Sequence, residues 1–132
     1  MEEEAQLAVV AKYSALPLDR LKYLPRATAD TIHQTTFGVV MILAFWSGPA
    51  AMAFRKYTSI LASMPQAAEL DVTVVNTDGI PELYNLPELR GRITGSCEVV
   101  FVRAGVIIDS VVRYDEEAFK VALDRFLESH HA

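Results

Sequence analysis

A continuous apolar stretch, Gly38–Phe45, is the strongest signal in the pattern of hydrophobic and polar positions along this chain. It has no polar face and is partly β-branched, which is typical of a strand buried on both faces of a sheet. After Pro49, apolar residues recur at helical spacing until Pro65, and proline favours a helix start and prevents its continuation. The sequence therefore predicts a buried strand that turns directly into a helix.

The segment before this strand is predicted to be mostly helical. Three leading glutamates, followed by an apolar face of Leu7, Val10 and Ala11, predict a helix over residues 2–15 that ends before Pro17. Residues 18–24 are expected to form a short amphipathic piece that Pro25 stops. A weak helix is expected over residues 29–36, because threonine lowers helix propensity.

The remaining two thirds alternate between strand and helix signals. Two strands, 98–103 and 106–112, are expected around a tight hairpin at Ala104-Gly105. Asp115 is expected to cap a final helix, with an i,i+4 ion pair between Glu116 and Lys120. Between the first strand-helix unit and the hairpin, the pattern predicts a strand at 70–76, a turn at Asp78-Gly79 and a short helix over 81–84.

This order of elements favours a mixed α/β sheet with helices on both faces. Strands separated by helices pair in parallel, and the closing hairpin adds an antiparallel strand. With 132 residues, of which 52% are hydrophobic and 22% charged, the chain is long enough for one globular domain.

Charge and cysteine content exclude several classes of function. The net charge is −5 and no Lys/Arg cluster offsets it, so we expect no direct contact with nucleic acid. No apolar run approaches the roughly 18–20 residues of a membrane span, and the acidic start MEEE does not resemble a secretory signal. The single Cys97 excludes an internal disulfide and a four-thiolate zinc site. We therefore expect a cytoplasmic protein that does not enter membranes.

Four features resemble the thioredoxin family. They are the buried strand running into Trp46-Ser47-Gly48-Pro49-Ala50, the following helix with Met52 near its start, the PELRGRI segment at 87–93, and the terminal EVVFVRAGVIIDSVV hairpin with its helix. The resemblance covers about residues 38–130. It implies a three-layer α/β/α fold with a mixed central sheet, a thioredoxin-like domain over residues 26–132 and an added helical extension over residues 1–25. It also implies that PELRGRI is helical.

The same resemblance locates the departures from the family pattern. The family's active corner reads W-C-G-P-C, whereas Ser47 and Ala50 occupy the two cysteine positions here. Met41 lies near the position of the family's buried carboxylate, and Cys97, with Ser96 beside it, near that of its cis-proline. Thiol–disulfide exchange needs an attacking thiolate and a second thiol to resolve the mixed disulfide. Classical oxidoreductase activity is therefore not expected.

Two interpretations of the corner stay open. It could contact a peptide or an anion through free backbone N–H groups at the helix start, or Gly48 and Pro49 could be present only because the turn needs them. Trp46 could anchor a partner or cap the core. The residues that the resemblance implies for partner binding are Trp46, Ser47, Gly48, Pro49, Ala50, Ser96 and Cys97.

Cys97 also supports an alternative function. If its side chain faced the positive end of the helix that starts near Pro49, its pKa would fall and its thiol would be reactive; otherwise it is a small buried hydrophobe. No metal site is expected at His33, His130 and His131, no cofactor is expected, and Glu98 and Asp109 are expected to face solvent. The lead hypothesis is a redox-inactive thioredoxin-like protein that binds a protein or an extended peptide as adaptor, assembly factor or chaperone. The alternative is a single-cysteine thiol enzyme or redox sensor that forms a glutathione-type mixed disulfide at Cys97.

Overall fold

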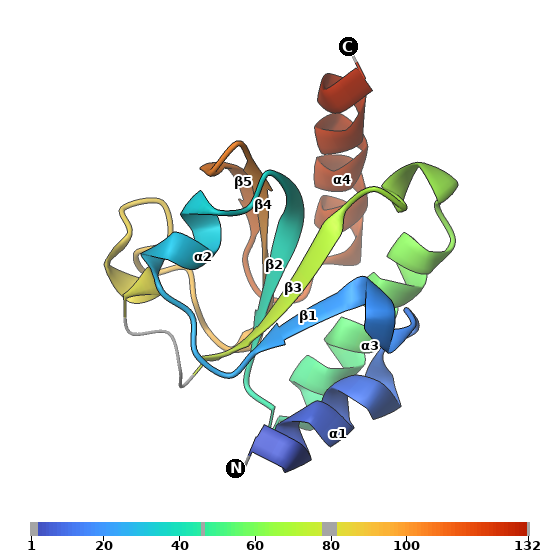
Figure 1. Cartoon of the computed structure of the whole chain (residues 1–132), viewed down its shortest axis with the longest axis vertical. Coiled ribbons are helices and arrows are strands. Elements are labelled where there is room, and N and C mark those ends of the chain that lie inside the picture. The colour runs from blue at the N-terminus through green and yellow to red at the C-terminus, as the bar shows by residue number, and fades with distance from the viewer. Residues whose placement is uncertain (1–2, 46, 78–81, 132) are drawn as a thin grey trace.

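A five-stranded mixed sheet forms the middle layer of the molecule (Figure 1). The structure is a computed structural model of the whole chain and describes residues 3–45, 47–77 and 82–131. The strand order is β1-β3-β2-β4-β5, with β1, β3 and β2 parallel and β4 and β5 antiparallel to their neighbours. The strands are β1 (Leu21–Leu24), β2 (Phe37–Leu43), β3 (Asp71–Asn76), β4 (Ser96–Arg103) and β5 (Val106–Val111).

The central strand β2 is buried along its whole length, which explains its unbroken apolar sequence. Its alternate side chains join two separate cores, with Val39 and Met41 on one face and Val40 and Ile42 on the other. The first face is covered by helices α1 (Glu3–Tyr13), α3 (Gly48–Ala62) and α4 (Glu116–His131), and the second by α2 (Ala29–His33) and the segment 83–93. The expected α/β/α arrangement of three layers is confirmed.

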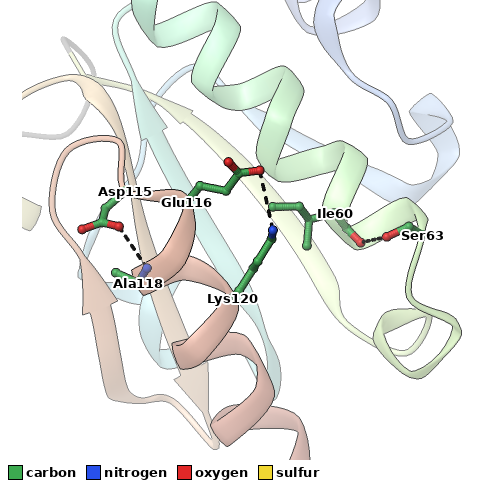
Figure 2. Close-up of polar contacts among 6 residues, drawn as sticks. All are labelled: Ile60, Ser63, Asp115, Glu116, Ala118 and Lys120. Carbon is green, nitrogen blue, oxygen red and sulfur yellow. Dashed lines mark hydrogen bonds and ion pairs between the residues drawn. The ribbon is translucent and has the colours of Figure 1, made fainter.

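The C-terminal hairpin and helix agree with the sequence pattern. Ala104 and Gly105 have φ of 51° and 76°, which is the geometry of a two-residue turn with positive φ at both central positions. Asp115 caps α4, because its Oδ1 accepts a hydrogen bond of 3.0 Å from the N–H of Ala118. Glu116 and Lys120 form the expected ion pair at 3.9 Å. Their interaction and the Asp115 cap are drawn in Figure 2.

The expectation of an amphipathic helical piece over residues 18–24 is wrong for its second half. Leu18–Arg20 is a single 3-10 turn, and Leu21–Leu24 is the edge strand β1, aligned with Val72–Val75 of β3. Four residues are too few for a period of two to be told from a period of 3.6, so pairing with β3 decides the conformation. The N-terminal segment therefore contributes a strand to the sheet as well as a helix.

Helix α1 packs on its own domain, but not through the face that the pattern indicates. Val10 is fully buried, whereas Leu7 is 46% exposed and Gln6 is buried. Gln6 accepts a hydrogen bond from the hydroxyl of Tyr23 on β1, which gives a polar residue a reason to lie inward. The apolar face predicted from Leu7, Val10 and Ala11 is thus rotated in the structure.

The PELRGRI segment is not helical. Residues 87–92 form successive turns, with N–H groups of Leu89 and Arg92 bonded to carbonyls three residues earlier, and Gly91 has a φ of 73°. That backbone conformation belongs to the left-handed region and ends any right-handed turn. Leu89 is nevertheless buried beneath the second face of the sheet. The short helix expected over 81–84 overlaps the 3-10 turn Leu83–Asn85, whereas Asp78-Gly79 and Pro81 lie outside the described residues.

No helix in the described part of the chain is long and apolar enough to span a membrane.

The Gly38→Ala substitution is expected to destabilise the fold, because a Cβ at position 38 would lie 2.4 Å from the carbonyl oxygen of Asp71 on the neighbouring strand. Gly38 and Asp71 are paired across the neighbouring strands β2 and β3, so the backbone of neither residue can move freely. The expected loss is about 2–3 kcal/mol of unfolding free energy, as for overpacked cores, measured by urea denaturation.

Gly48→Ala is the matched control, since a Cβ there meets nothing within 4 Å. Gly48 is the first residue of α3, and the substitution is expected to leave stability unchanged or to raise it by less than about 1 kcal/mol. Equal midpoints for the two variants would contradict the close approach of β2 and β3.

Candidate functional site

The strand-to-helix corner lies where β2 leads into α3, as the sequence predicts. Ser47 is the N-cap of α3, and its Oγ accepts a hydrogen bond of 3.3 Å from the N–H of Ala50. Ser47 also accepts a bond of 3.0 Å from the N–H of Ala51 through its backbone carbonyl. The side chain of Ala50 is fully buried in the core on this face. The hydroxyl therefore stabilises the helix start and the methyl group fills the core.

Few donors remain at the start of α3 for an anion. Pro49 has no N–H, and the N–H groups of Ala50 and Ala51 are already bonded to Ser47. The first turn therefore offers at most the N–H of Gly48. Anion binding at this helix start, which needs several converging N–H groups, is disfavoured. A single donor still suits one peptide carbonyl.

Gly48 is not required by the turn itself. Its φ is not in the left-handed region, and a Cβ at this position would meet no atom within 4 Å. The interpretation that Gly48 persists because the corner needs it is therefore wrong in steric terms. Gly48 and Pro49 are both exposed, so the corner presents to solvent a surface without large side chains at these two positions.

The loop before β4 lies against this corner. The N–H of Ala44 donates to the carbonyl of Gly95 at 2.9 Å, and Leu43 pairs with Ser96. Gly95 has a φ of 84°, and a Cβ there would come within 3.3 Å of both Ala44 and Thr77. Ser96 is half-buried beside the corner. The fold thus brings Ser96 and Cys97 to the end of β2, as the resemblance implies.

Cys97 is the extra residue of a β-bulge. Ile42 pairs with Glu98 and Leu43 with Ser96, so Cys97 has no partner on β2 and adopts a φ of 72°. Its side chain is fully buried in the same core as Ala50 and Tyr57. Burial, and secondarily the charge of Glu98, raises the pKa of the Cys97 thiol far above its ordinary value of 9.0. The low pKa required by the alternative hypothesis is therefore wrong for this thiol.

Glu98 does not face solvent, contrary to expectation. Only 3% of it is exposed, and its carboxylate accepts four hydrogen bonds. Oε1 accepts from the N–H groups of Thr94 and Gly95 at 2.9 and 2.8 Å. Oε2 accepts from the hydroxyl of Thr94 at 2.6 Å and from the N–H of Arg113 at 2.9 Å. One carboxylate thus fixes the loop before β4, the bulge and the chain that leads to α4. Asp109 is exposed, as expected.

The other residues considered from the sequence do not add to this site. Met41 is fully buried in the core, and His33 is exposed at the end of α2. The described residues contain no group of three His, Cys, Asp or Glu side chains that could hold a metal ion. Trp46, and the side chains of His130 and His131, lie outside the part of the chain that the structure describes.

Solved structures of thioredoxins match the observed arrangement over most of the chain. A thioredoxin of Malassezia sympodialis matches with a TM-score of 0.62 at 22% identity, over 81% of this chain and 90% of that chain. Fasciola hepatica thioredoxin matches with a TM-score of 0.60 at 20% identity, over 80% and 98%. This chain has a thioredoxin-like fold.

A further match is a solved structure described as the structural basis of the thiol resolving mechanism in yeast mitochondrial 1-Cys peroxiredoxin. Its TM-score is 0.61 at 18% identity, over 80% of the thioredoxin-like chain described here and 94% of the matched chain. No protein-family model and no curated protein sequence matches. These likenesses establish the fold alone.

The polar residues that shape this site are ones that no local sequence pattern predicts. Thr94 and Arg113 bond to Glu98, and Tyr57 links α3 to the start of α4 by accepting a 2.8 Å hydrogen bond from the N–H of Asp115. Thr94 lies 4 residues from Glu98, whereas Arg113 and Tyr57 are bonded to residues 15 and 58 positions away. The one sequence signal for this buried polar network was the position of a glutamate, Glu98, between Cys97 and the apolar residues that follow it.

Glu98→Ala is expected to destabilise the protein by about 3–5 kcal/mol, because the N–H groups of Thr94, Gly95 and Arg113 would all lose their acceptor. Glu98→Gln keeps the volume and one acceptor oxygen, so it is expected to lose less than half as much. Urea denaturation measures both. An alanine variant as stable as the parent protein would contradict the role given to this carboxylate.

Native Cys97 is expected to react with iodoacetamide at least about a hundredfold more slowly than the same chain in guanidinium chloride, since the thiol is buried and protonated. Because the folded-state pKa lies above the unfolded value, the contribution of Cys97 to the unfolding free energy should be constant below pH 9 and fall as the pH rises further.

A Cys97→Ser/Ser96→Cys double variant is the matched control, as it moves the single thiol by one residue to a half-buried position. Its labelling should be fast in the native state. Fast native labelling of the parent Cys97 would contradict the burial of this side chain and restore the alternative hypothesis.

Proposed function

We propose that this thioredoxin-like protein is a protein-binding module, an adaptor, assembly factor or chaperone, without dithiol–disulfide oxidoreductase activity. The observation that carries the proposal is that the side chains of Ser47, Ala50 and Cys97 all have structural roles. Ser47 caps a helix, Ala50 fills the core, and Cys97, the one cysteine of the 132 residues, is buried. Disulfide exchange needs two accessible sulfur atoms at one place, and none is available at this corner. A cytoplasmic location is part of the same proposal.

The corner retains what recognition of an extended segment requires. Gly48 and Pro49 are exposed and carry no large side chain. The loop at Thr94–Ser96 lies beside them, because the N–H of Ala44 is hydrogen-bonded to the carbonyl of Gly95. Glu98 holds that loop in one conformation, so little ordering entropy is lost when a partner binds. The proposed partner is a protein or an extended peptide that contacts Trp46, Ser47, Gly48, Pro49 and Ser96. Ala50 and Cys97 support this surface from below.

The single-cysteine alternative has less support. A glutathione-type mixed disulfide would require the Cys97 sulfur to reach solvent as a thiolate, but the side chain is fully buried and its pKa is raised by that burial. Cys97→Ser is therefore expected to retain partner binding.

Photo-crosslinking tests the proposed surface. A benzoylphenylalanine at position 48 has open space around its Cβ and is expected to form adducts with a small set of proteins in cells. The same residue at Ala62, exposed at the far end of α3, is the matched control and should not give those adducts. Trp46→Ala should weaken the adducts at position 48 if that side chain anchors the partner.

Identical adducts from positions 48 and 62 would remove the support for a specific surface at the corner. Catalysed reduction of insulin disulfides by the purified protein would overturn the redox-inactive half of the proposal. A Ser47→Cys/Ala50→Cys double variant provides a comparison, since it restores two sulfur atoms to the same scaffold.

A further inference from the structure

A groove of about 640 Å³ runs between α3 and α4 on the outer surface of the molecule. Its floor is apolar and comes from Met52, Ile60 and Met64. Met52 is 47% exposed, while Ile60 and Met64 are half-buried at the margin of the core. Figure 2 shows Glu116 and Lys120 reaching from α4 toward Ile60 on α3. The groove thus places apolar side chains at the surface beside charged side chains of both helices.

The spacing of the lining residues fits a third helix. On α3 they recur every fourth residue, at Met52, Lys56 and Ile60, and on α4 at Glu116, Lys120 and Asp124. Rows at i and i+4 are the ridges between which another helix packs. From Met52 to the end of α3 at Ala62 the groove is about 15 Å long at 1.5 Å per residue, or roughly three turns. No strand edge lines it, so an extended segment would find no backbone to pair with.

The charges along the groove differ from those of the chain as a whole. Its lining includes three cations, Arg55, Lys56 and Lys120, and two carboxylates, Glu116 and Asp124. Lys120 is paired with Glu116 on α4 itself. Arg55 and Lys56 are the two cations that α3 contributes; Lys56 lies in the same row as Met52 and Ile60, and its ammonium lies over the ring of Tyr114. On a chain of net charge −5, this groove is locally positive.

We propose that the α3–α4 groove binds an amphipathic helix of a partner protein, with its apolar stripe on Met52, Ile60 and Met64 and an acidic flank along Arg55 and Lys56. The inference rests on the proposed protein-binding role but uses a surface separate from the corner at Ser47–Ala50. Methionine side chains adapt to different apolar partners, which suits an adaptor. Arg55 and Lys56 on α3 favour acidic side chains on the flank of the partner helix that faces them. Such complementary charge selects the partner and its orientation.

A second copy of this chain is a poorer occupant. Each described helix carries no more than one large exposed apolar side chain, namely Leu7 on α1, Met52 on α3 and Val121 on α4. None therefore presents the stripe at i, i+3, i+4 and i+7 that fills such a groove.

The probe is a synthetic 18-residue amphipathic peptide with leucines on one stripe and glutamates on the flank, compared with the same peptide carrying lysines in place of the glutamates. The glutamate peptide is expected to bind the full chain at least about tenfold more tightly at low salt, and the difference should shrink as salt is added. Fluorescence anisotropy gives both affinities, and amide chemical shifts locate the site.

Three variants complete the experiment. Arg55→Glu/Lys56→Glu should reverse the preference between the two peptides, and Ile60→Ser should weaken binding of both. Arg90→Glu, an exposed charge change in the turns at 87–92, is the control and should leave both affinities unchanged.

Equal affinity for the two peptides, or shifts centred on residues 47–50 and 94–97, would overturn the groove and leave the corner surface intact. Self-association that Ile60→Ser abolishes, detected by sedimentation, would overturn the assignment to a partner helix in favour of a second copy. Gly48 does not line the groove, and adducts at position 48 that persist in the Ile60→Ser variant report on the corner alone, so each proposal can fail without the other.

Discussion

The buried carboxylate of Glu98 holds together the parts of the chain from which the corner surface is built. Its two oxygens accept hydrogen bonds from Thr94 and Gly95 on one side and from Arg113 on the other. Between them, Cys97 takes a left-handed backbone conformation and leaves the ladder with β2. Glu98 thus accepts hydrogen bonds from backbone N–H groups before and after this bulge, which fixes the chain on both sides of it. The position of the loop beside the corner and the approach to α4 both follow from this one side chain.

The hydroxyl and the thiol at the corner have structural roles, which bears on function. The Ser47 hydroxyl is bonded to the start of α3, and the Cys97 thiol lies in the core. What remains accessible is surface shape, with an exposed Gly48 and Pro49 next to a rigid loop. The proposed recognition role relies on this accessible surface, because the Ser47 hydroxyl and the Cys97 thiol already have structural roles.

Helix α3 connects the two surfaces proposed for partners. Its N-terminus forms the corner, and its outward side forms one wall of the groove with α4. The same helix buries Phe54, Tyr57 and Leu61 against the sheet. Tyr57 also bonds to the N–H of Asp115, which fixes the start of α4 relative to α3. Both surfaces are therefore rigidly placed, and a partner that contacts both would meet a fixed spacing between them.

The sequence determined the elements whose patterns are long or chemically distinctive. The unbroken run of β2, the stripe of α4 with its Asp115 cap, and the turn at Ala104-Gly105 follow from local rules of periodicity and backbone conformation. The resemblance around Ser47–Ala50 led to the right architecture.

The tertiary structure decided what depends on distant partners. It made Leu21–Leu24 a strand through pairing with β3, turned Gln6 inward and Leu7 outward, and buried Glu98 beneath hydrogen bonds that include one from a residue 15 positions away. Burial and pairing of this kind are set by contacts remote in sequence, which the spacing of neighbouring residues does not encode.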